Sequence, residues 1–115
     1  MKGIEWNEFV EDAWYGIDAF MEYKNEVYQY GGGYIKEIDK FYSYVWRLKA
    51  VNATGPVDWH PVNSVFDAYE VECDTLWEAY FNLGEDHWGA FLAQKLFDGK
   101  TLLEAGDEVE FLEWG

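Results

Sequence analysis

The sequence predicts a mainly α-helical fold of three to four helices around an aromatic core, with a small β-hairpin at the C-terminus. Apolar residues recur at steps of three and four through much of the chain, as on one face of a helix. Half of the 115 residues are apolar and 21% are aromatic, which is enough for a core without disulfides. No linker interrupts the chain, so we expect a single acidic globular domain over 1–115.

The first predicted helix covers 4–30. Its apolar positions have helical spacing: Trp6, Phe9, Val10, Ala13, Ile17, Phe20, Met21, Val27 and Tyr28. Acidic residues fall mostly on the other face: Glu8, Glu11, Asp12, Asp18, Glu22 and Glu26. The run Gly31–Gly33 is expected to end the helix, because glycine readily adopts the left-handed conformation found at helix ends.

A second helix is predicted over 34–50. Its inward positions include Ile35, Ile38, Val45 and Leu48. Its outward side would carry a basic stripe, which we expect to pair with acids of a neighbouring helix or a second subunit. That stripe consists of Lys36, Lys40, Tyr44 and Arg47. A loop follows over 52–61, where both prolines lie.

The third predicted helix covers 64–83. It would present a second acidic stripe, formed by Asp67, Glu70, Asp74 and Glu78. Tyr69, Val71 and Cys73 alternate as in a strand, but the length of the segment favours a helix. Asp86 is expected to cap a short fourth helix that ends at Phe97. The hairpin is predicted from 100 to 114.

The net charge of −15 is the strongest indication of function. Residues 1–30 carry −5, residues 31–52 carry +2 and residues 53–115 carry −12. Such a chain repels phosphate backbones and anionic membranes, which excludes direct binding of nucleic acid or a membrane surface. The favoured partner is a basic protein. In the alternative interpretation, the acidity serves only solubility.

Catalytic and metal-binding motifs are not found in the sequence. The two histidines, His60 and His87, lack the Glu-x-x-His context of di-iron bundles, and no His-x-x-x-His or Cys-x-x-Cys spacing occurs. The glycine run does not join a strand to a helix as a phosphate loop does. We therefore predict no enzyme activity, no cofactor and no metal. The N-terminus has no signal region, and no apolar run is long enough to span a membrane, so a cytoplasmic location is expected, in a bacterial cell or a phage-infected host.

The sequence thus favours an acidic inhibitor or decoy that occupies a basic nucleic-acid-binding surface of another protein, and we expect that protein to be a nucleic-acid-binding enzyme. In composition the chain resembles DNA-mimic, anti-restriction, anti-CRISPR and nuclease-immunity proteins. The predicted partner-binding residues are Glu8, Glu11, Asp18, Glu22, Glu26, Asp67, Glu70, Asp74, Glu78 and Trp59. One alternative is a non-enzymatic structural or adaptor protein, which could form a homodimer. A further alternative is a small enzyme in which two carboxylates meet across a cleft.

Overall fold

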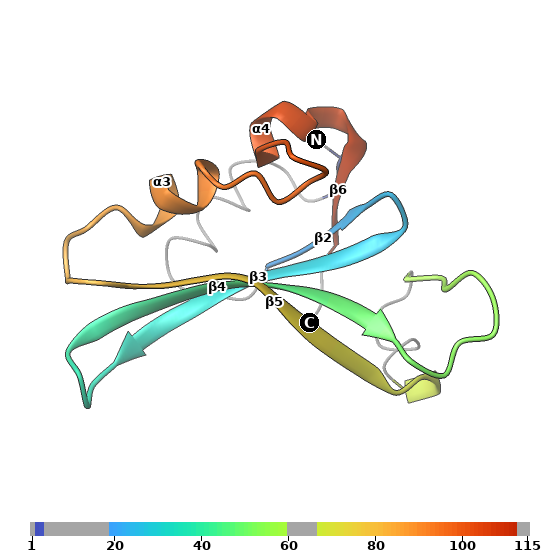
Figure 1. Cartoon of the computed structure of the whole chain (residues 1–115), viewed down its shortest axis with the longest axis horizontal. Coiled ribbons are helices and arrows are strands. Elements are labelled where there is room, and N and C mark those ends of the chain that lie inside the picture. The colour runs from blue at the N-terminus through green and yellow to red at the C-terminus, as the bar shows by residue number, and fades with distance from the viewer. Residues whose placement is uncertain (1, 4–18, 60–66, 113–115) are drawn as a thin grey trace.

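The computed structural model describes residues 2–3, 19–59 and 67–112, and its main feature is a twisted β-sheet (Figure 1). The strands are β1 (Lys2–Gly3), β2 (Ala19–Tyr23), β3 (Glu26–Ile35), β4 (Lys40–Ala50), β5 (Val71–Phe81) and β6 (Val109–Leu112). The described helices are α3 (His87–Leu92), α4 (Leu102–Ala105) and the 3-10 helix η1 (Gly106–Glu108). The predicted mainly α-helical fold is therefore wrong.

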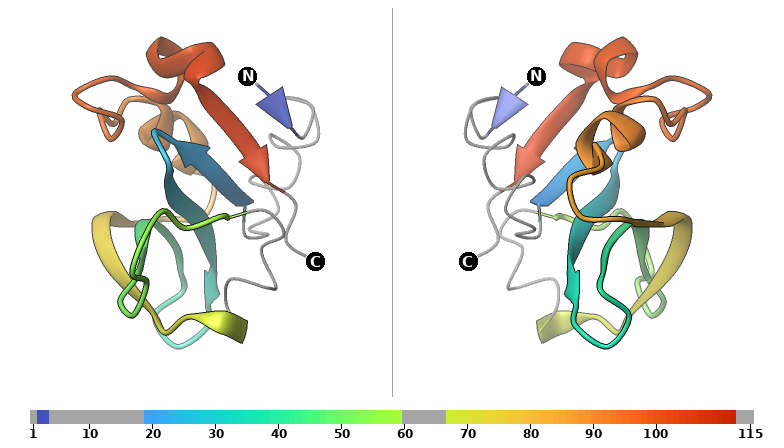
Figure 2. Two further views of the ribbon diagram at one scale, coloured as in Figure 1. Left: turned by 90° about the vertical axis from the view of Figure 1, so that its right-hand side faces the viewer. Right: turned by 90° about the vertical axis from the view of Figure 1, so that its left-hand side faces the viewer.

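The sheet has the strand order β1-β6-β2-β3-β4-β5. Strand β1 runs parallel to β6, and all other neighbours are antiparallel. Figure 2 shows β6 beside β2, so a strand from the C-terminal part of the chain pairs with one from its first quarter. Strand β5 forms one edge of the sheet.

Two hairpins replace the first two predicted helices in the part of the chain that the structure describes. Residues 19–35 form β2 and β3, which are joined by the two-residue loop Lys24–Asn25. Both loop residues have positive φ, 49° and 63°, as the twist of a tight hairpin requires. Residues 40–50 form β4, which pairs with β3 along its length. The predicted helical segment 4–18 lies outside the described residues.

The glycine run lies inside β3 and does not end a helix. Gly31, Gly32 and Gly33 are paired with Tyr44, Ser43 and Tyr42 of β4. A Cβ added at Gly32 would clash with the carbonyl oxygen of Tyr42, so only glycine fits this close approach of the two strands.

The third predicted helix is also wrong, because residues 71–81 form β5. This strand pairs with β4, and an irregularity in the pairing falls between Val45 and Trp46. Such a bulge breaks the simple alternation of side chains along a strand. The strand-like alternation of Val71 and Cys73 was therefore the correct signal, because both residues belong to β5.

The fourth predicted helix is confirmed in kind but is shorter, since α3 ends at Leu92. The Asp86 cap is confirmed, with its carboxylate accepting the backbone N–H of Gly89 at 2.8 Å. The predicted C-terminal hairpin is wrong. The segment forms α4, whose start is closed by reciprocal hydrogen bonds between Thr101 and Glu104, and then η1 and β6.

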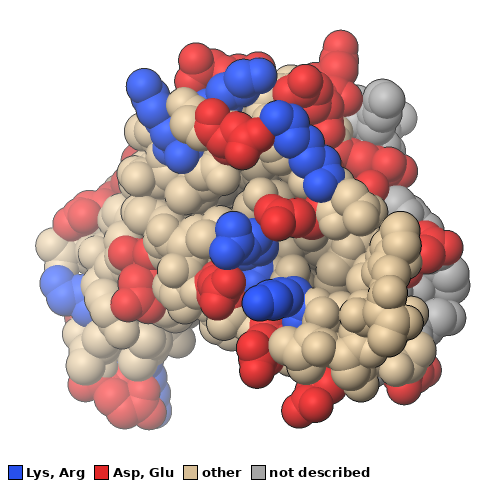
Figure 3. Space-filling view, turned by 45° about the vertical axis from the view of Figure 1, so that its right-hand side comes forward, with Lys and Arg blue, Asp and Glu red and all other residues tan. Residues whose placement is uncertain are grey.

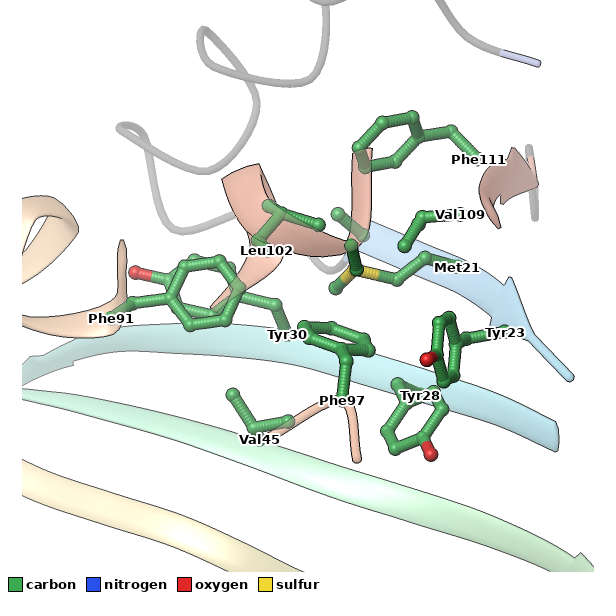
Figure 4. Close-up of a cluster of buried hydrophobic side chains, with 12 residues drawn as sticks. Met21, Tyr23, Tyr28, Tyr30, Val45, Phe91, Phe97, Leu102, Val109 and Phe111 are labelled. Carbon is green, nitrogen blue, oxygen red and sulfur yellow. The ribbon is translucent and has the colours of Figure 1, made fainter. Parts of the chain in front are cut away.

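Both faces of the sheet carry buried side chains. The larger cluster lies on the side of α3 and α4, where Phe97 packs among the tyrosines of β2 and β3 (Figure 4). Its buried members are Ala19, Met21, Tyr23, Tyr28, Tyr30, Val45, Phe91, Phe97, Leu102, Ala105, Val109 and Phe111. A second cluster contains Phe20, Val27, Leu48, Trp59 and Leu112. No described helix is long and apolar enough to cross a membrane.

Candidate functional site

The acids predicted on the first helix do not form a helical stripe within the described residues. Glu8, Glu11 and Asp18 lie outside those residues. Glu22 is half-buried in β2, and Glu26 is exposed at the start of β3, where it accepts a hydrogen bond from the Tyr28 hydroxyl at 3.2 Å. The two described acids therefore flank a hairpin loop.

The acids of the third predicted helix are exposed, but they lie on both faces of the sheet. Asp74 is opposite Arg47 and forms an ion pair with it at 3.0 Å. Glu78 is opposite Tyr44, which belongs to the other face. The predicted single stripe is wrong because β-strand geometry and the bulge separate these carboxylates.

An acidic edge nevertheless remains. We use this name for Asp67, Glu70, Glu72, Asp74 and Glu78, which are all exposed on β5 and the residues before it. Residues 50–94 contain eight Asp and Glu and no Lys or Arg. Across 19–59 and 67–112, seventeen acids stand against seven Lys and Arg, an excess of ten negative charges.

Trp59 does not form part of a surface. Its side chain is only 3% exposed and packs with Phe20, Val27 and Leu48. The indole N–H donates to the backbone carbonyl of Asn25 at 3.1 Å. The expectation that this tryptophan is an exposed contact residue is wrong.

The predicted basic stripe is divided in a similar way. Arg47 pairs with Asp74 of a neighbouring strand, so the expected pairing with an acid is confirmed for this residue, although with a strand and not a helix. This pairing raises the pKa of the Arg47 guanidinium. Lys40 donates to the side-chain oxygen of Asn82. Tyr44 and Arg47 are three residues apart in β4, so their side chains lie on opposite faces of the sheet.

A pocket of about 390 Å³ lies between the end of β4 and the segment 55–59. Its charged lining residues are Glu26, Arg47, Lys49 and Asp74, which contribute two charges of each sign. Figure 3 shows basic side chains close to acidic ones around a hollow on this side of the molecule. Because the charges balance, the pocket offers no excess of charge to an ionic ligand.

A second feature of β4 and β5 is an aromatic row, formed by Tyr42, Tyr44, Trp46 and Tyr80. The ring centroids of Tyr42 and Tyr80 are 5.0 Å apart, and those of Tyr42 and Tyr44 are 5.6 Å apart. Tyr44 stacks on Trp46 at 4.2 Å. The row was missed because it follows a period of two, whereas a helical period was assigned to this segment.

His87 is buried beside a pocket of about 260 Å³ that Phe41 and Leu83 also line. Its ring stacks on Phe41 at 4.2 Å, and its Nδ1 lies 3.4 Å from the Tyr30 hydroxyl. Burial lowers the pKa of His87, which favours the neutral imidazole. The hydroxyls of Tyr30 and Ser43, 3.4 Å apart, are fully buried and cannot meet a substrate, so this group serves packing.

The described residues contain no group of three or more His, Cys, Asp or Glu arranged to hold a metal ion. Comparison of the chain with protein-family models, with curated proteins and with solved structures finds no match. The acidic edge and the aromatic row are therefore the two features of the described residues that bear on function.

Proposed function

We propose that the protein is an acidic inhibitor or decoy that occupies a basic nucleic-acid-binding surface of another protein. One observation carries the proposal: residues 50–94 hold eight acids without a single Lys or Arg, and all eight are exposed. A surface with an excess of one sign attracts a partner of the opposite sign and accelerates their encounter. The same charge disfavours direct binding of DNA or RNA.

The spacing of the acids indicates how much of the affinity charge alone supplies. From Glu70 to Glu78 the chain advances about 26 Å at ~3.3 Å per residue. Four acids lie in this interval, but Asp74 is paired with Arg47, which leaves three, or about one per 9 Å. One DNA strand carries a charge about every 3.4 Å, so the acidic edge has less than half of that charge density and short-range contacts must complement it.

Self-association through β5 is a weaker interpretation. Two copies paired along this edge would bring their acids together, and like charges on paired strands are destabilising. The acidic edge suits a basic partner better than a second copy.

A competition assay tests the proposal. Proteins captured from a bacterial lysate are each bound to labelled duplex DNA, and the acidic protein is added. We expect it to displace the DNA, and to do so less effectively as salt rises, because salt screens the attraction. The double substitution Glu70→Lys with Glu72→Lys should weaken displacement by about tenfold or more.

The matched control is Asp107→Lys with Glu108→Lys in η1, which changes the net charge by the same amount, from −15 to −11. This variant should displace DNA almost as well as the unaltered protein. Thermal melting of both variants verifies folding. A captured partner that binds equally well with its DNA in place would refute the decoy function and favour the adaptor.

A further inference from the structure

We propose that the aromatic row and Glu78 form a site that binds arginine side chains of a basic protein partner. The inference rests on the proposed function, since it names the chemistry by which one face of the β4–β5 edge would hold the same partner. The site lies on one face of the sheet, where rings from β4 and β5 and a carboxylate from β5 come together.

The rings are arranged so that a flat cation can stack on them. Tyr80 is 57% exposed, and its ring lies 35° from the plane of the Tyr42 ring. Tyr44 continues the row at 33° to Tyr42, and Trp46 lies 27° from Tyr44. Because Tyr44 and Trp46 cover each other's faces, the place for a guanidinium group is over the exposed ring of Tyr80 at the end of the row, where it gains both cation–π attraction and stacking.

Glu78 supplies the negative charge beside these rings. It is exposed, and its Oε2 accepts the hydroxyl hydrogen of Tyr42 at 2.6 Å. Within the described part of the chain, this is the only hydrogen bond or ion pair of that carboxylate. The bond fixes the position of the carboxylate and leaves Oε1 for an N–H of a guanidinium.

Space is present on the β3 side of the row. Gly33 is paired with Tyr42, and a Cβ added at this glycine would meet nothing within 4 Å. A side chain reaching across β3 would therefore have room to approach Tyr42 and Glu78. The glycine leaves the row open at this point.

Charge complementarity identifies the occupant as arginine in a basic protein. The aromatic row lies on a chain of net charge −15. Arg47 of β4 points to the other face of the sheet, where it pairs with Asp74. A nucleic acid would be repelled, although its bases could stack. An uncharged sugar could stack on the rings and donate a hydroxyl to Glu78, but it would not neutralise the carboxylate. Arginine uses both features.

The test compares binding of deca-arginine and deca-lysine peptides to the full chain by isothermal titration calorimetry. Arginine should bind several-fold more tightly, because lysine cannot stack its ammonium as a plane. Tyr80→Leu keeps an apolar side chain but removes the ring, and should weaken deca-arginine binding by about two- to fivefold. Tyr80→Phe keeps the ring and should bind as the unaltered protein does.

The charge is tested with a matched pair. Glu78→Gln and Glu72→Gln each remove one negative charge from an exposed position of β5, but Glu72 is paired with Lys49 on the other face. Glu78→Gln should reduce the preference for arginine over lysine, and Glu72→Gln should leave it unchanged. Melting temperatures close to that of the unaltered chain show that the variants fold.

The outcomes separate the site from the function. Equal binding of both peptides, unaffected by Tyr80→Leu, would overturn the arginine site while leaving an acidic binder of basic proteins in place. Binding of neither peptide would count against the proposed function itself. Binding of cellohexaose that depends on Tyr80, without a preference for arginine, would overturn the inference in favour of a sugar-binding surface.

Discussion

Replacing Gly32 by alanine is a direct test of the sheet that carries the candidate site. Gly32 pairs with Ser43, and a Cβ built on it lies well under 3.0 Å from the Tyr42 carbonyl oxygen and 3.2 Å from the Ser43 Cα. These atoms belong to the backbone of β4, which is also paired with β5 on its other side. The strand therefore cannot move away without disturbing two sets of hydrogen bonds.

The expected magnitude follows from two opposing effects. Forcing extra atoms into a packed region costs about 1–3 kcal/mol, and the upper part of that range applies because the obstacle is backbone. Alanine restricts the unfolded chain more than glycine does, which returns about 0.4–1 kcal/mol. Gly32→Ala should thus lower the free energy of unfolding by about 1–2 kcal/mol.

Gly33→Ala is the matched control, because the added Cβ meets nothing within 4 Å. Only the effect on the unfolded chain remains, so this variant should be as stable as the unaltered protein or more stable by up to about 1 kcal/mol. Urea unfolding followed by tryptophan fluorescence measures both. Equal stability of the two variants would refute the pairing of Gly32 with Ser43 and with it the register of β3 and β4.

Two further predictions concern buried polar groups. The Tyr23 hydroxyl is buried without a hydrogen-bond partner among the described residues, so Tyr23→Phe should leave the free energy of unfolding by urea unchanged or raise it by about 1 kcal/mol. Tyr30→Phe removes a hydroxyl that contacts Ser43 and His87, so it should lower the same free energy by a similar amount. Burial lowers the pKa of His87 in the folded protein. The neutral imidazole therefore contributes fully to stability above about pH 6.5, the usual pKa of histidine, and this contribution is lost as the pH falls toward the lower folded-state pKa. The loss is at most ~1.4 kcal/mol for each pH unit. The stability difference between the unaltered protein and His87→Gln, measured by urea unfolding, should therefore shrink between about pH 7.5 and 5.5; a difference that does not change with pH would contradict the shielding of this imidazole.

The helical fold was predicted because β2, β3 and β4 carry large apolar side chains on both faces. Tyr28 and Val45 belong to one buried cluster, whereas Val27 and Leu48 belong to the other. Strands buried on both sides show no clear alternation, and their apolar residues then also satisfy a helical spacing. The Lys24–Asn25 loop lacks the glycine that usually marks a two-residue hairpin.

Local chemistry was predicted more reliably than long-range packing. The Asp86 cap depends on residues within three positions, so the sequence contains all of it. Trp59 looked exposed because it lies between two prolines in a polar loop, but its burial depends on Phe20 and Leu48, which are distant in the chain. An acidic surface was expected from composition. The aromatic row could be recognised only by assigning the two-residue period of a strand to 40–50.

Charge and rings act at different stages of the association proposed for β5. The acids act at a distance and raise the rate of encounter, and salt screens this effect over about 8–10 Å. The contacts of Tyr80 and Glu78 form only after docking, so they determine how long a complex lasts. The association rate should therefore depend on salt and on Glu70 and Glu72, whereas Tyr80→Leu should alter mainly the dissociation rate. Because the two features lie on the neighbouring strands β4 and β5, stopped-flow kinetics with one partner can separate steering by the acidic edge from retention by the aromatic row.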